Sequence, residues 1–512
     1  MIGLWNLASA DPDRTAVVEA GTGRSATRGE LARRTNQVVH ALRARGLGHG
    51  SVVGVILDNE IAHLEVFFAG LQAGWYVVPI NYHFTEEEIA FILNDSDAEA
   101  VVCSSDHAEV VAAAADRTTI PREARLCVGG HAAFEDYDEV IGAASGELPD
   151  DRTAGWMMTY TSGTTGSPKG IKRPLSGMNP DDVGEVWSLP MRIFGIDGED
   201  HVHLVQSPIY HTAVLVYMNA SAQFGHQIVL MKRWDAEQAL QLIERYGVTT
   251  SHMVPTHFHR MLKLPDAVRE KYDLSSVRYA IHGAAPCPVE TKRAMIDWFG
   301  PVIYEYYGAS EGGGTQVGSD DWLARPGTVG RAWPGAEVRI LGPDGEELPR
   351  GDQGEVWMMA GALDFEYHKN AERTATSKRD GFFTVGDVGI MDDDGYLFLQ
   401  GRSSDIIISG GVNVHPSEIE SVLIQHDAVA DVAVFGIPDP EWGEQIKSVV
   451  ELTAGTVGDD ALLAELVAFC RSHLAAYKVP RSIDLIDALP RDPNGKLYKR
   501  LLRDPYWDDA EG

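Results

Sequence analysis

Short apolar runs alternate with helix-like patterns in the first part of the chain. These runs and patterns follow one another at residues 31–45, 52–57, 61–72 and 76–80, with the first and third helical and the other two strand-like. A capping box at residues 85–88 predicts the start of a further helix. The alternation predicts an α/β fold with a mostly parallel sheet.

The alternation of strand-like and helical patterns returns later in the chain and is then replaced by a pattern of short strands and turns. Residues 170–200 are polar and rich in Gly and Pro, which predicts a loop. Strand-like runs resume at residues 201–206, 227–231, 248–254 and 276–282, with a helical pattern at 235–246. Two α/β halves are therefore expected. From about residue 325 to 400, turns between short alternating strands predict a β-rich subdomain.

A further change falls at residues 401–405, a Gly-Arg-Ser-Ser-Asp sequence. Beyond it, residues 417–420 resemble a capping box for a helix that ends near residue 425. Strand-like runs at 429–437, 448–452 and 483–486 and a helical pattern at 459–474 follow. The sequence thus predicts a large N-terminal domain, residues 1–402, and a small C-terminal α/β domain, residues 403–512.

Composition narrows the class of protein. The 512 residues include 43 basic and 75 acidic side chains, for a net charge of −32. This charge argues against sequence-independent nucleic-acid binding and against docking on anionic membranes, and a polyanionic ligand needs a locally basic entry. The four cysteines have no paired spacing, so neither disulfides nor a zinc site are indicated. The N-terminus has no signal-peptide pattern and no run is long enough to span a membrane, so a cytoplasmic location is expected.

The densest cluster of hydroxyl and glycine residues follows a short apolar run at 156–160. Its glycines allow close backbone approach, its hydroxyls can donate to phosphate oxygens, and its lysine adds positive charge. It is not a Walker A loop, because a proline precedes the lysine and a glycine follows it. The anion-binding candidates in it are Thr161, Ser162, Gly163, Thr164, Thr165, Gly166 and Lys169.

This loop resembles the phosphate loop of the adenylate-forming superfamily, which includes acyl-CoA synthetases, peptide-synthetase adenylation domains and luciferases. Further motifs in family order extend the resemblance over essentially the whole chain. They are Gly283-Ala284-Ala285-Pro286, Tyr307-Gly308-Ala309-Ser310-Glu311, the Gly386-Asp387 turn, Gly401-Arg402, the segment from Asp405 to Glu420, and Pro490-Arg491 to Gly495-Lys496.

The resemblance implies a role for each nucleotide-binding residue. Gly283, Ala284, Ala285 and Pro286 would lie against adenine, on which Tyr307, followed by Gly308, would stack. Asp387 would accept the ribose hydroxyls, a role that suits a carboxylate, and Arg402 would reach the ribose and phosphates. Ser310, where Thr is commoner, would contact the α-phosphate, and Glu311 would bind Mg²⁺, a hard ion that prefers carboxylate and phosphate oxygens.

The resemblance also implies how the small domain works. Lys496 would bridge the substrate carboxylate and the α-phosphate. The family pivots this domain two residues after the arginine, here at Ser404 beside Asp405, although Asp or Lys is commoner there. Gly410 and Gly411 would then pass close to pantetheine. Lys499, Arg500 and Arg503 would contact CoA phosphates or form a solvated helix face.

The acid is expected to lie near Tyr210 and His211, which the resemblance assigns to the acyl and pantetheine channel. No Asp occurs between residues 202 and 225, where amino-acid-activating relatives carry one, so a plain carboxylic acid is expected. Gly312, Gly313 and Gly314 lack side chains near the expected acyl tunnel, which predicts a large apolar acid, polycyclic acids included.

The resemblance therefore implies an acyl-CoA synthetase that uses ATP, Mg²⁺ and CoA to convert a small-molecule carboxylic acid into an acyl-AMP and then a thioester. Three alternatives stay open. The chain could pass acyl-AMP to a carrier protein or partner enzyme, sense nucleotide without catalysis, or support a luciferase-type oxidation. A homodimer is also left open.

Overall fold

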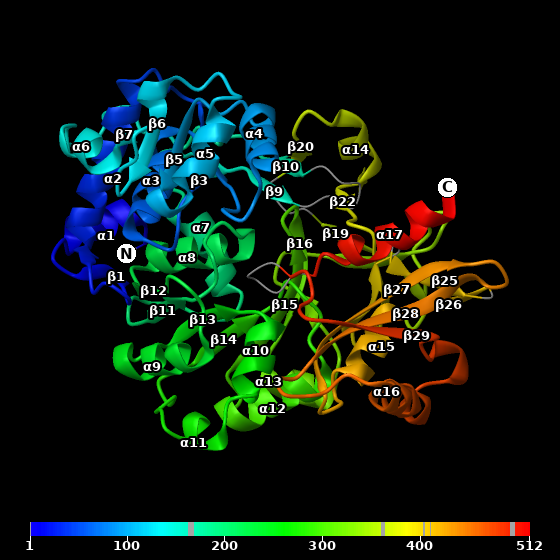
Figure 1. Ribbon diagram of the computed structural model, residues 1–512. Coiled ribbons are helices and arrows are strands. Elements are labelled where there is room, and N and C mark those ends of the chain that lie inside the picture. The colour runs from blue at the N-terminus through cyan, green and yellow to red at the C-terminus, as the bar shows by residue number, and fades with distance from the viewer. Residues whose placement is uncertain are drawn as a thin grey trace.

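The computed structural model describes residues 2–161, 168–359, 364–402, 405–409, 411–491 and 497–511. Within these ranges, four sheets belong to the N-terminal part and a separate sheet belongs to the C-terminal part (Figure 1). The N-terminal elements occupy the left of the view, and the elements from β25 onward lie at the right. No helix within the described ranges is both long and apolar enough to cross a bilayer.

The first sheet is parallel throughout and has the strand order β7-β6-β5-β3-β4-β8. Its strands are β3 (Val52–Ile56), β4 (Tyr76–Pro79), β5 (Ala100–Ser104), β6 (Arg125–Val128), β7 (Glu135–Asp136) and β8 (Trp156–Met157). The helices of this region are α2 (Arg28–Arg43), α3 (Ile61–Ala73), α4 (Glu86–Asp95), α5 (Ala108–Ala115) and α6 (Tyr137–Gly142). Every residue of α3 is buried, because this helix contacts strands of both this sheet and the next one.

The second sheet has nine strands in the order β17-β16-β15-β14-β13-β11-β12-β1-β2. They are β1 (Thr15–Glu19), β2 (Ser25–Thr27), β11 (Val202–Val205), β12 (Gln227–Leu230), β13 (Thr250–Met253), β14 (Tyr279–His282), β15 (Ile303–Ala309), β16 (Gly312–Val317) and β17 (Arg331–Ala332). The strands from β1 to β15 in this order are parallel, and antiparallel strands close both edges. The carboxyl ends of the parallel strands therefore share one edge, where α/β proteins bind ligands.

Helices before, between and after these strands cover the nine-stranded sheet. They are α1 (Leu4–Ala10), α7 (Gly184–Arg192), α8 (Thr212–Phe224), α9 (Ala236–Tyr246), α10 (Pro255–Leu262), α11 (Asp266–Arg269), α12 (Val289–Phe299) and α13 (Ser319–Ala324). The expectation that residues 170–200 form only a loop is wrong, since α7 lies there. Its buried residues recur at Gly184, Trp187, Ser188 and Met191, a helical period that the Gly and Pro content of the region masks.

The β-rich region contains two smaller sheets. One has the order β21-β22-β19-β23-β24, with β18 paired to β19, and the other has the order β20-β10-β9. The elements are β9 (Thr159–Thr161), β10 (Lys169–Lys172), β18 (Val338–Leu341), β19 (Gln353–Met359), β20 (Glu366–Tyr367), α14 (Ala371–Thr376), β21 (Lys378–Arg379), β22 (Phe382–Phe383), β23 (Asp387–Met391) and β24 (Leu397–Arg402). Residues far apart in sequence, 159–172 and 366–367, thus meet in one sheet.

The C-terminal sheet has the order β26-β25-β28-β27, and β29 pairs with β28. Its elements are β25 (Ile407–Ser409), β26 (Val412–Val414), α15 (Pro416–Leu423), β27 (Val429–Asp439), β28 (Gly443–Leu452), α16 (Asp460–His473), β29 (Ser482–Ile486) and α17 (Lys499–Glu511). A core of its own joins this sheet to α15 and α16. The large N-terminal part and the smaller C-terminal α/β domain agree with the predicted fold class.

Of the two predicted capping boxes, one is confirmed and one is wrong. Thr85 caps α4 reciprocally with Glu88. At the second site the helix begins two residues early, with Pro416 in its first turn and His415, not Ser417, at the N-cap. Ser417 donates instead to the carbonyl oxygen of Gln400, because a proline at the first helical position sets the start of the helix.

Candidate active site

Ser310 and Glu311 form the turn between β15 and β16. The guanidinium of Arg173 donates hydrogen bonds to the carbonyl oxygens of Ser310, at 3.1 Å, and of Glu311, at 2.6 Å. The Tyr367 hydroxyl donates to Glu311 Oε1 at 2.7 Å. Because its backbone and its carboxylate are both held, the buried Glu311 has a fixed orientation at the edge of the sheet.

Lys169 begins β10 beside this turn. Its ammonium nitrogen is buried and has no hydrogen-bond partner within the described part of the chain. Burial and the positive charge of Arg373 lower the pKa of Lys169, while the nearby Glu311 carboxylate opposes that shift. A buried cation without a partner is costly, so an anionic group beside Lys169, such as a phosphate, would be stabilising.

Tyr307, Asp387 and Arg402 come from three strands and form one hydrogen-bonded group. The Tyr307 hydroxyl donates to Asp387 Oδ2 at 2.7 Å, and Arg402 Nε donates to Asp387 Oδ1 at 3.0 Å. The pairing of β23 with β24 places Asp387 opposite Arg402. An ionised carboxylate has about four acceptor positions, so Asp387 can still accept from two further hydroxyl groups.

The N-terminus of α8 lies next to the same turn. The Ser310 hydroxyl donates to Thr212 Oγ1 at 3.4 Å, and His211 is the N-cap residue of this 13-residue helix. The rings of Tyr210 and His211 lie 4.3 Å apart. A helix N-terminus carries unpaired N–H groups and partial positive charge, so a carboxylate or phosphate beside Ser310 is favoured there.

The segment from Gly283 to Pro286 follows β14 at the ligand edge of the sheet. Gly283 is buried, and a Cβ at that position would lie 2.6 Å from the ring of Tyr306. Ala284 and Pro286 are exposed, and Ala284 has a left-handed φ of 67°. The segment is therefore available to a flat ligand, and its contact with adenine stays a prediction.

Two glycines of the run after Glu311 lie close against other side chains. A Cβ on Gly313 would lie 2.7 Å from the Cβ of Met358, and one on Gly314 would lie 2.3 Å from the ring of Trp333. Met358 and Trp333 occupy the space that these two side chains would take, and the role of the glycine run in the acyl pocket stays a prediction. Gly312 begins β16 with a φ of 125°. Gly308 pairs opposite Gly314 across β15 and β16.

Several predicted residues lie outside the described residues. They are Ser162, Gly163, Thr164, Thr165, Gly166, Ser404, Gly410 and Lys496, and the side chain of Thr161 is likewise not described. Among their neighbours, Asp405 affects Arg402. Burial lowers the pKa of Arg402, but nearby negative charge, to which Asp405 contributes, outweighs that effect and raises it. Gly411 is exposed and has a left-handed φ of 78°.

Sequence reasoning missed Arg173 and Tyr367, which hold Glu311, and a buried ion pair between Lys292 and Glu305. Lys292 Nζ lies 2.6 Å from Glu305 Oε2, with both side chains almost fully buried. Arg173 follows Lys169 by four residues in the sequence, but nothing in the sequence distinguishes it from an ordinary surface arginine. Only the fold brings it against the turn.

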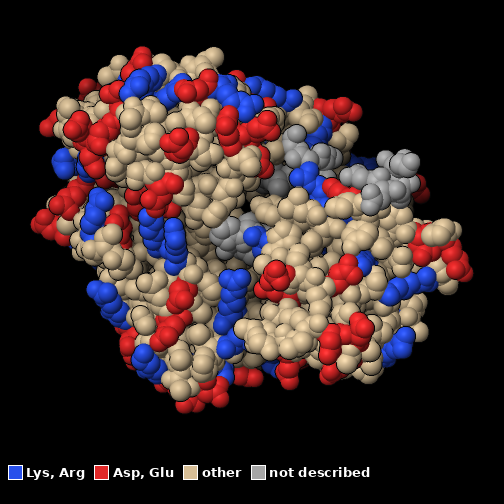
Figure 2. All heavy atoms as spheres, in the orientation of Figure 1, with Lys and Arg blue, Asp and Glu red and all other residues tan. Residues whose placement is uncertain are grey.

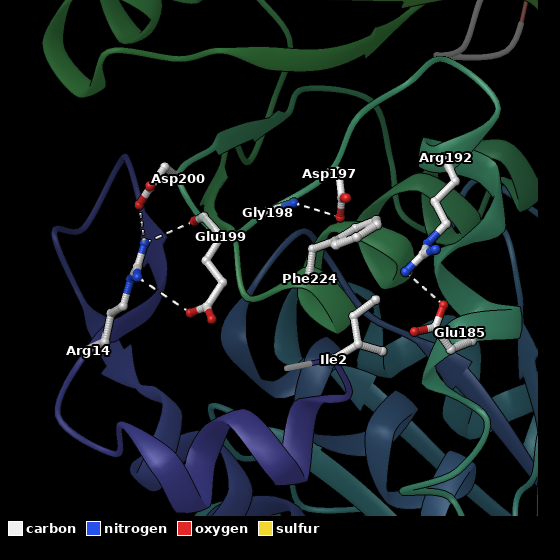
Figure 3. A pocket seen from close by; sticks show the side chains of 9 residues that line it. All are labelled: Ile2, Arg14, Glu185, Arg192, Asp197, Gly198, Glu199, Asp200 and Phe224. Carbon is white, nitrogen blue, oxygen red and sulfur yellow. Dashed lines mark hydrogen bonds and ion pairs between the residues drawn. The ribbon is translucent and has the colours of Figure 1, made fainter.

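A separate hollow of about 520 Å³ lies near the N-terminus (Figure 3). Its charged side chains pair with one another: Arg14 lies 3.5 Å from Glu199, and Arg192 lies 2.7 Å from Glu185. None of the predicted catalytic or nucleotide-binding residues lines this hollow. The active-site candidate is therefore the group around Glu311 and Asp387.

Comparisons with known proteins identify the family of the chain. The family model described as "AMP-binding enzyme" matches residues 4–363, and the model described as "AMP-binding enzyme C-terminal domain" matches residues 418–496. The long-chain-fatty-acid–CoA ligase FadD13 of Mycobacterium tuberculosis is 31% identical, over 98% of this chain and 97% of that protein. The fatty acid–[acyl-carrier-protein] ligase ScoC of Streptomyces coeruleorubidus is 31% identical, over 95% of this chain and 93% of that protein.

Among solved structures, ATP-bound MatB from Rhodopseudomonas palustris has a TM-score of 0.83 and 30% identity, covering 99% of this chain and 100% of that one. The first family model alone spans more than half of the chain, and the second spans much of the C-terminal domain. The chain therefore belongs to the AMP-binding, or adenylate-forming, enzyme family and is an ATP-dependent, AMP-forming ligase.

Proposed function

We propose that this enzyme activates a carboxylic acid as acyl-AMP and transfers the acyl group to CoA. A carboxylate resists nucleophiles because its leaving group would be oxide. Attack of the carboxylate on the α-phosphate of ATP releases pyrophosphate and makes AMP the leaving group. The thiol of CoA then displaces AMP to form the thioester. The main support is the meeting of Lys169, Ser310, Glu311 and Asp387 at one edge of the sheet.

The nucleotide would lie between the end of β14 and the Asp387 group. Adenine would stack on Tyr307 beside the segment 283–286, and the ribose hydroxyls would donate to Asp387. This arrangement is supported by the hydrogen bonds from Tyr307 and Arg402, which fix the Asp387 carboxylate and leave acceptor positions on it.

The phosphates would lie between Lys169, Ser310 and the N-terminus of α8. Glu311 would hold Mg²⁺, which neutralises phosphate charge when it is bound, and a single fixed carboxylate suits that ion. The buried amine of Lys169 gains an anionic partner there. Positive groups fixed before the reaction stabilise the negative charge that develops on the phosphoryl oxygens. We also assign Lys496 to the reacting oxygens, on the resemblance alone.

The second step would require the C-terminal domain, taken as residues 403–512, to turn about Ser404 and Asp405. The hairpin of β25 and β26 carries two exposed apolar side chains, Ile408 and Val412. Exposed apolar side chains on a short hairpin gain stability when a domain movement covers them. Gly411 lies between these two strands, and it would border the pantetheine together with Gly410, which is outside the described residues.

An unpaired basic strip, defined here as Arg233, Arg260 and Lys263, supports CoA as the acceptor. All three are exposed and have no ion-pair partner among the residues that the structure describes. By contrast, Lys499 lies 2.7 Å from Glu420 and Arg503 lies 3.3 Å from Asp504. Figure 2 shows basic side chains over the position of α10, beside the central furrow. Free cations on so acidic a chain favour a polyphosphate ligand.

The basic strip also leads toward the channel residues. Burial, His107 and Arg233 together lower the pKa of His83, so Arg233 acts on that region. The neighbouring Tyr82 ring packs edge-on against Tyr210, with centroids 5.0 Å apart. A CoA whose phosphates contact Arg233 would therefore direct its thiol toward Tyr210 and His211.

The alternative acceptor is a carrier protein, as the name of the Streptomyces relative states for that enzyme. A carrier protein presents the same pantetheine thiol without the adenosine phosphates. Release of pyrophosphate from ATP·Mg²⁺ and a panel of acids, with and without CoA, separates the two proposals. CoA-dependent turnover with a thioester product supports the synthetase. Pyrophosphate release without a CoA thioester favours the carrier-protein reaction.

A further inference from the structure

Two consecutive tyrosines of β15 divide the candidate site. Successive side chains of a strand point to opposite faces. Tyr307 bonds to Asp387 on the proposed nucleotide side, and Tyr306 packs on the other face toward α8. An acyl group bound to the α-phosphate would have to extend on the side away from the nucleotide. The side chains around Tyr306 therefore border the space open to the acid.

Tyr306 belongs to a cluster of three rings, Tyr217, His252 and Tyr306. The rings of Tyr217 and His252 stack at 5.0 Å, and the ring of Tyr306 lies 5.5 Å from Tyr217. The Tyr306 hydroxyl and His252 Nε2 form a hydrogen bond of 2.9 Å. Tyr217 and His252 are buried, while Tyr306 keeps some exposure. Of the three rings, which we call the wall, only Tyr306 thus has accessible surface.

The cluster spans from the sheet to α8. The Tyr306 ring lies so close to Gly283 that a Cβ there would come within 2.6 Å of it. On its other side the ring meets Tyr217 of α8. Tyr217 stands five residues after Thr212, the residue next to Ser310. Along a helix this separation is about 7.5 Å. The acyl group therefore has little room between the reacting carboxylate and the three rings.

We propose that Tyr217, His252 and Tyr306 form the closed end of the acyl slot, so that the enzyme activates compact acids, either short aliphatic or single-ring. This inference rests on the proposed acid activation. It names the class of acid, and it reverses the prediction of a bulky acid drawn from the glycine run. It also separates this chain from the long-chain acids that the name of the mycobacterial relative specifies.

The hydrogen bond to His252 holds the wall closed. Burial lowers the pKa of His252 to about 3, so the imidazole is neutral at any ordinary pH and its hydrogen bond with the Tyr306 hydroxyl is kept. Burial also raises the pKa of Tyr306, so the phenol stays protonated. To admit a long chain, Tyr306 would have to break this bond and leave both neighbouring rings.

The test is the chain-length profile of pyrophosphate release in the full-length enzyme. For the wild type we expect kcat/KM for hexanoate or benzoate to exceed that for dodecanoate by about tenfold or more, the scale on which pocket shape discriminates. Tyr306→Ala and Tyr217→Ala should each raise kcat/KM for dodecanoate about tenfold and change that for hexanoate by less than about threefold. Tyr306→Phe keeps the ring but loses the hydrogen bond to His252, so it should raise kcat/KM for dodecanoate by less than Tyr306→Ala does.

A matched control lies on the same face of the sheet. The Tyr304 ring lies tilted against Tyr279, with centroids 5.3 Å apart, and edge-on to Phe194 at 5.8 Å, and it belongs to neither the wall nor the proposed nucleotide site. Tyr304→Ala should leave the profile unchanged. If Tyr304→Ala raises kcat/KM for dodecanoate as much as Tyr306→Ala does, the effect comes from a general loosening of packing around the site, and the inference is wrong.

A binding measurement keeps the inference separate from the proposed function. Calorimetry with hexanoyl- and dodecanoyl-sulfamoyl adenosine, stable analogues of acyl-AMP, should give tighter binding of the hexanoyl compound to the wild type. Tyr306→Ala should remove that preference, and Tyr306→Leu serves if the alanine variant does not fold. Equal binding of both analogues by the wild type contradicts the closed slot, whatever the turnover. If no acid supports pyrophosphate release but the wild type still binds the hexanoyl analogue more tightly, only the proposed reaction is contradicted.

Discussion

Glu311 is held by two residues whose importance is not visible from the motif itself. Arg173 fixes its backbone and Tyr367 fixes its carboxylate. Such supporting hydrogen bonds keep a metal-binding carboxylate in one orientation and typically change metal affinity or activity by 10–100-fold when removed. The two interactions can be tested separately, because only one of them involves the carboxylate.

We therefore expect Glu311→Gln to lower kcat/KM for pyrophosphate release about 100-fold, and Tyr367→Phe about tenfold. The amide keeps the shape of Glu311 but loses the negative charge that Mg²⁺ requires. Titration of Mg²⁺ at fixed ATP should show a raised half-saturating concentration in both variants. An unchanged Mg²⁺ dependence in Glu311→Gln would show that this residue does not hold the ion.

A second residue-scale prediction concerns Glu60, which precedes α3. Burial raises the pKa of Glu60 to about 7, although a hydrogen bond from Ser104 opposes the shift. The folded state thus binds more protons than the unfolded state between about pH 4.5 and 7, and stability contributed by Glu60 is lost as the pH rises through that window. Glu60→Gln should remove a pH-dependent difference of about 1–3 kcal/mol. Urea unfolding at pH 5 and pH 8 measures it, and parallel pH profiles for both proteins would contradict it.

At the scale of elements, a buried ion pair joins α12 to β15, the strand that carries the site. Burial raises the pKa of Glu305 and lowers that of Lys292, but the 2.6 Å contact keeps the charges partnered. The ammonium group also lies 4.7 Å from the ring centroid of Trp322. Removal of one partner leaves the other charge buried alone, whereas replacement of both leaves an apolar contact.

We expect Lys292→Met to lower the free energy of unfolding by about 3 kcal/mol, and Lys292→Met/Glu305→Leu to recover most of that loss. Urea denaturation of the two single variants and the double variant gives the coupling energy. Additive losses in the double variant would mean that the two side chains do not act as a pair.

The elements also show which features a sequence can and cannot specify. The capping box at Thr85 is local and was predictable, whereas Pro416 moved the second helix start and gave Ser417 another partner. The motif residues Ser310, Glu311, Tyr307 and Asp387 were predictable because their spacing is characteristic of the family. The wall of Tyr217, His252 and Tyr306 was not, since it joins three elements whose contacts depend on packing.

At the scale of the whole molecule, the charge distribution sets the conditions for ligand binding. A net charge of −32 repels a polyanion such as CoA over long distances. In the proposed function, association of CoA would therefore depend on the local field of the basic strip. For the proposed transfer, that strip would also have to lie within reach of Tyr210 and His211.

We predict that Arg233→Glu/Arg260→Glu raises the KM for CoA at least about tenfold and weakens its salt dependence, because charge contacts on the surface are screened by salt. Acyl-AMP formation in a single turnover without CoA should stay unchanged, since neither residue contacts the proposed ATP site. Arg24→Glu/Arg245→Glu carries the same change in net charge on exposed residues elsewhere and serves as the control. An equal rise in both double variants would assign the effect to net charge. An unchanged KM in the strip variant would remove the strip from CoA binding and favour an acceptor without adenosine phosphates.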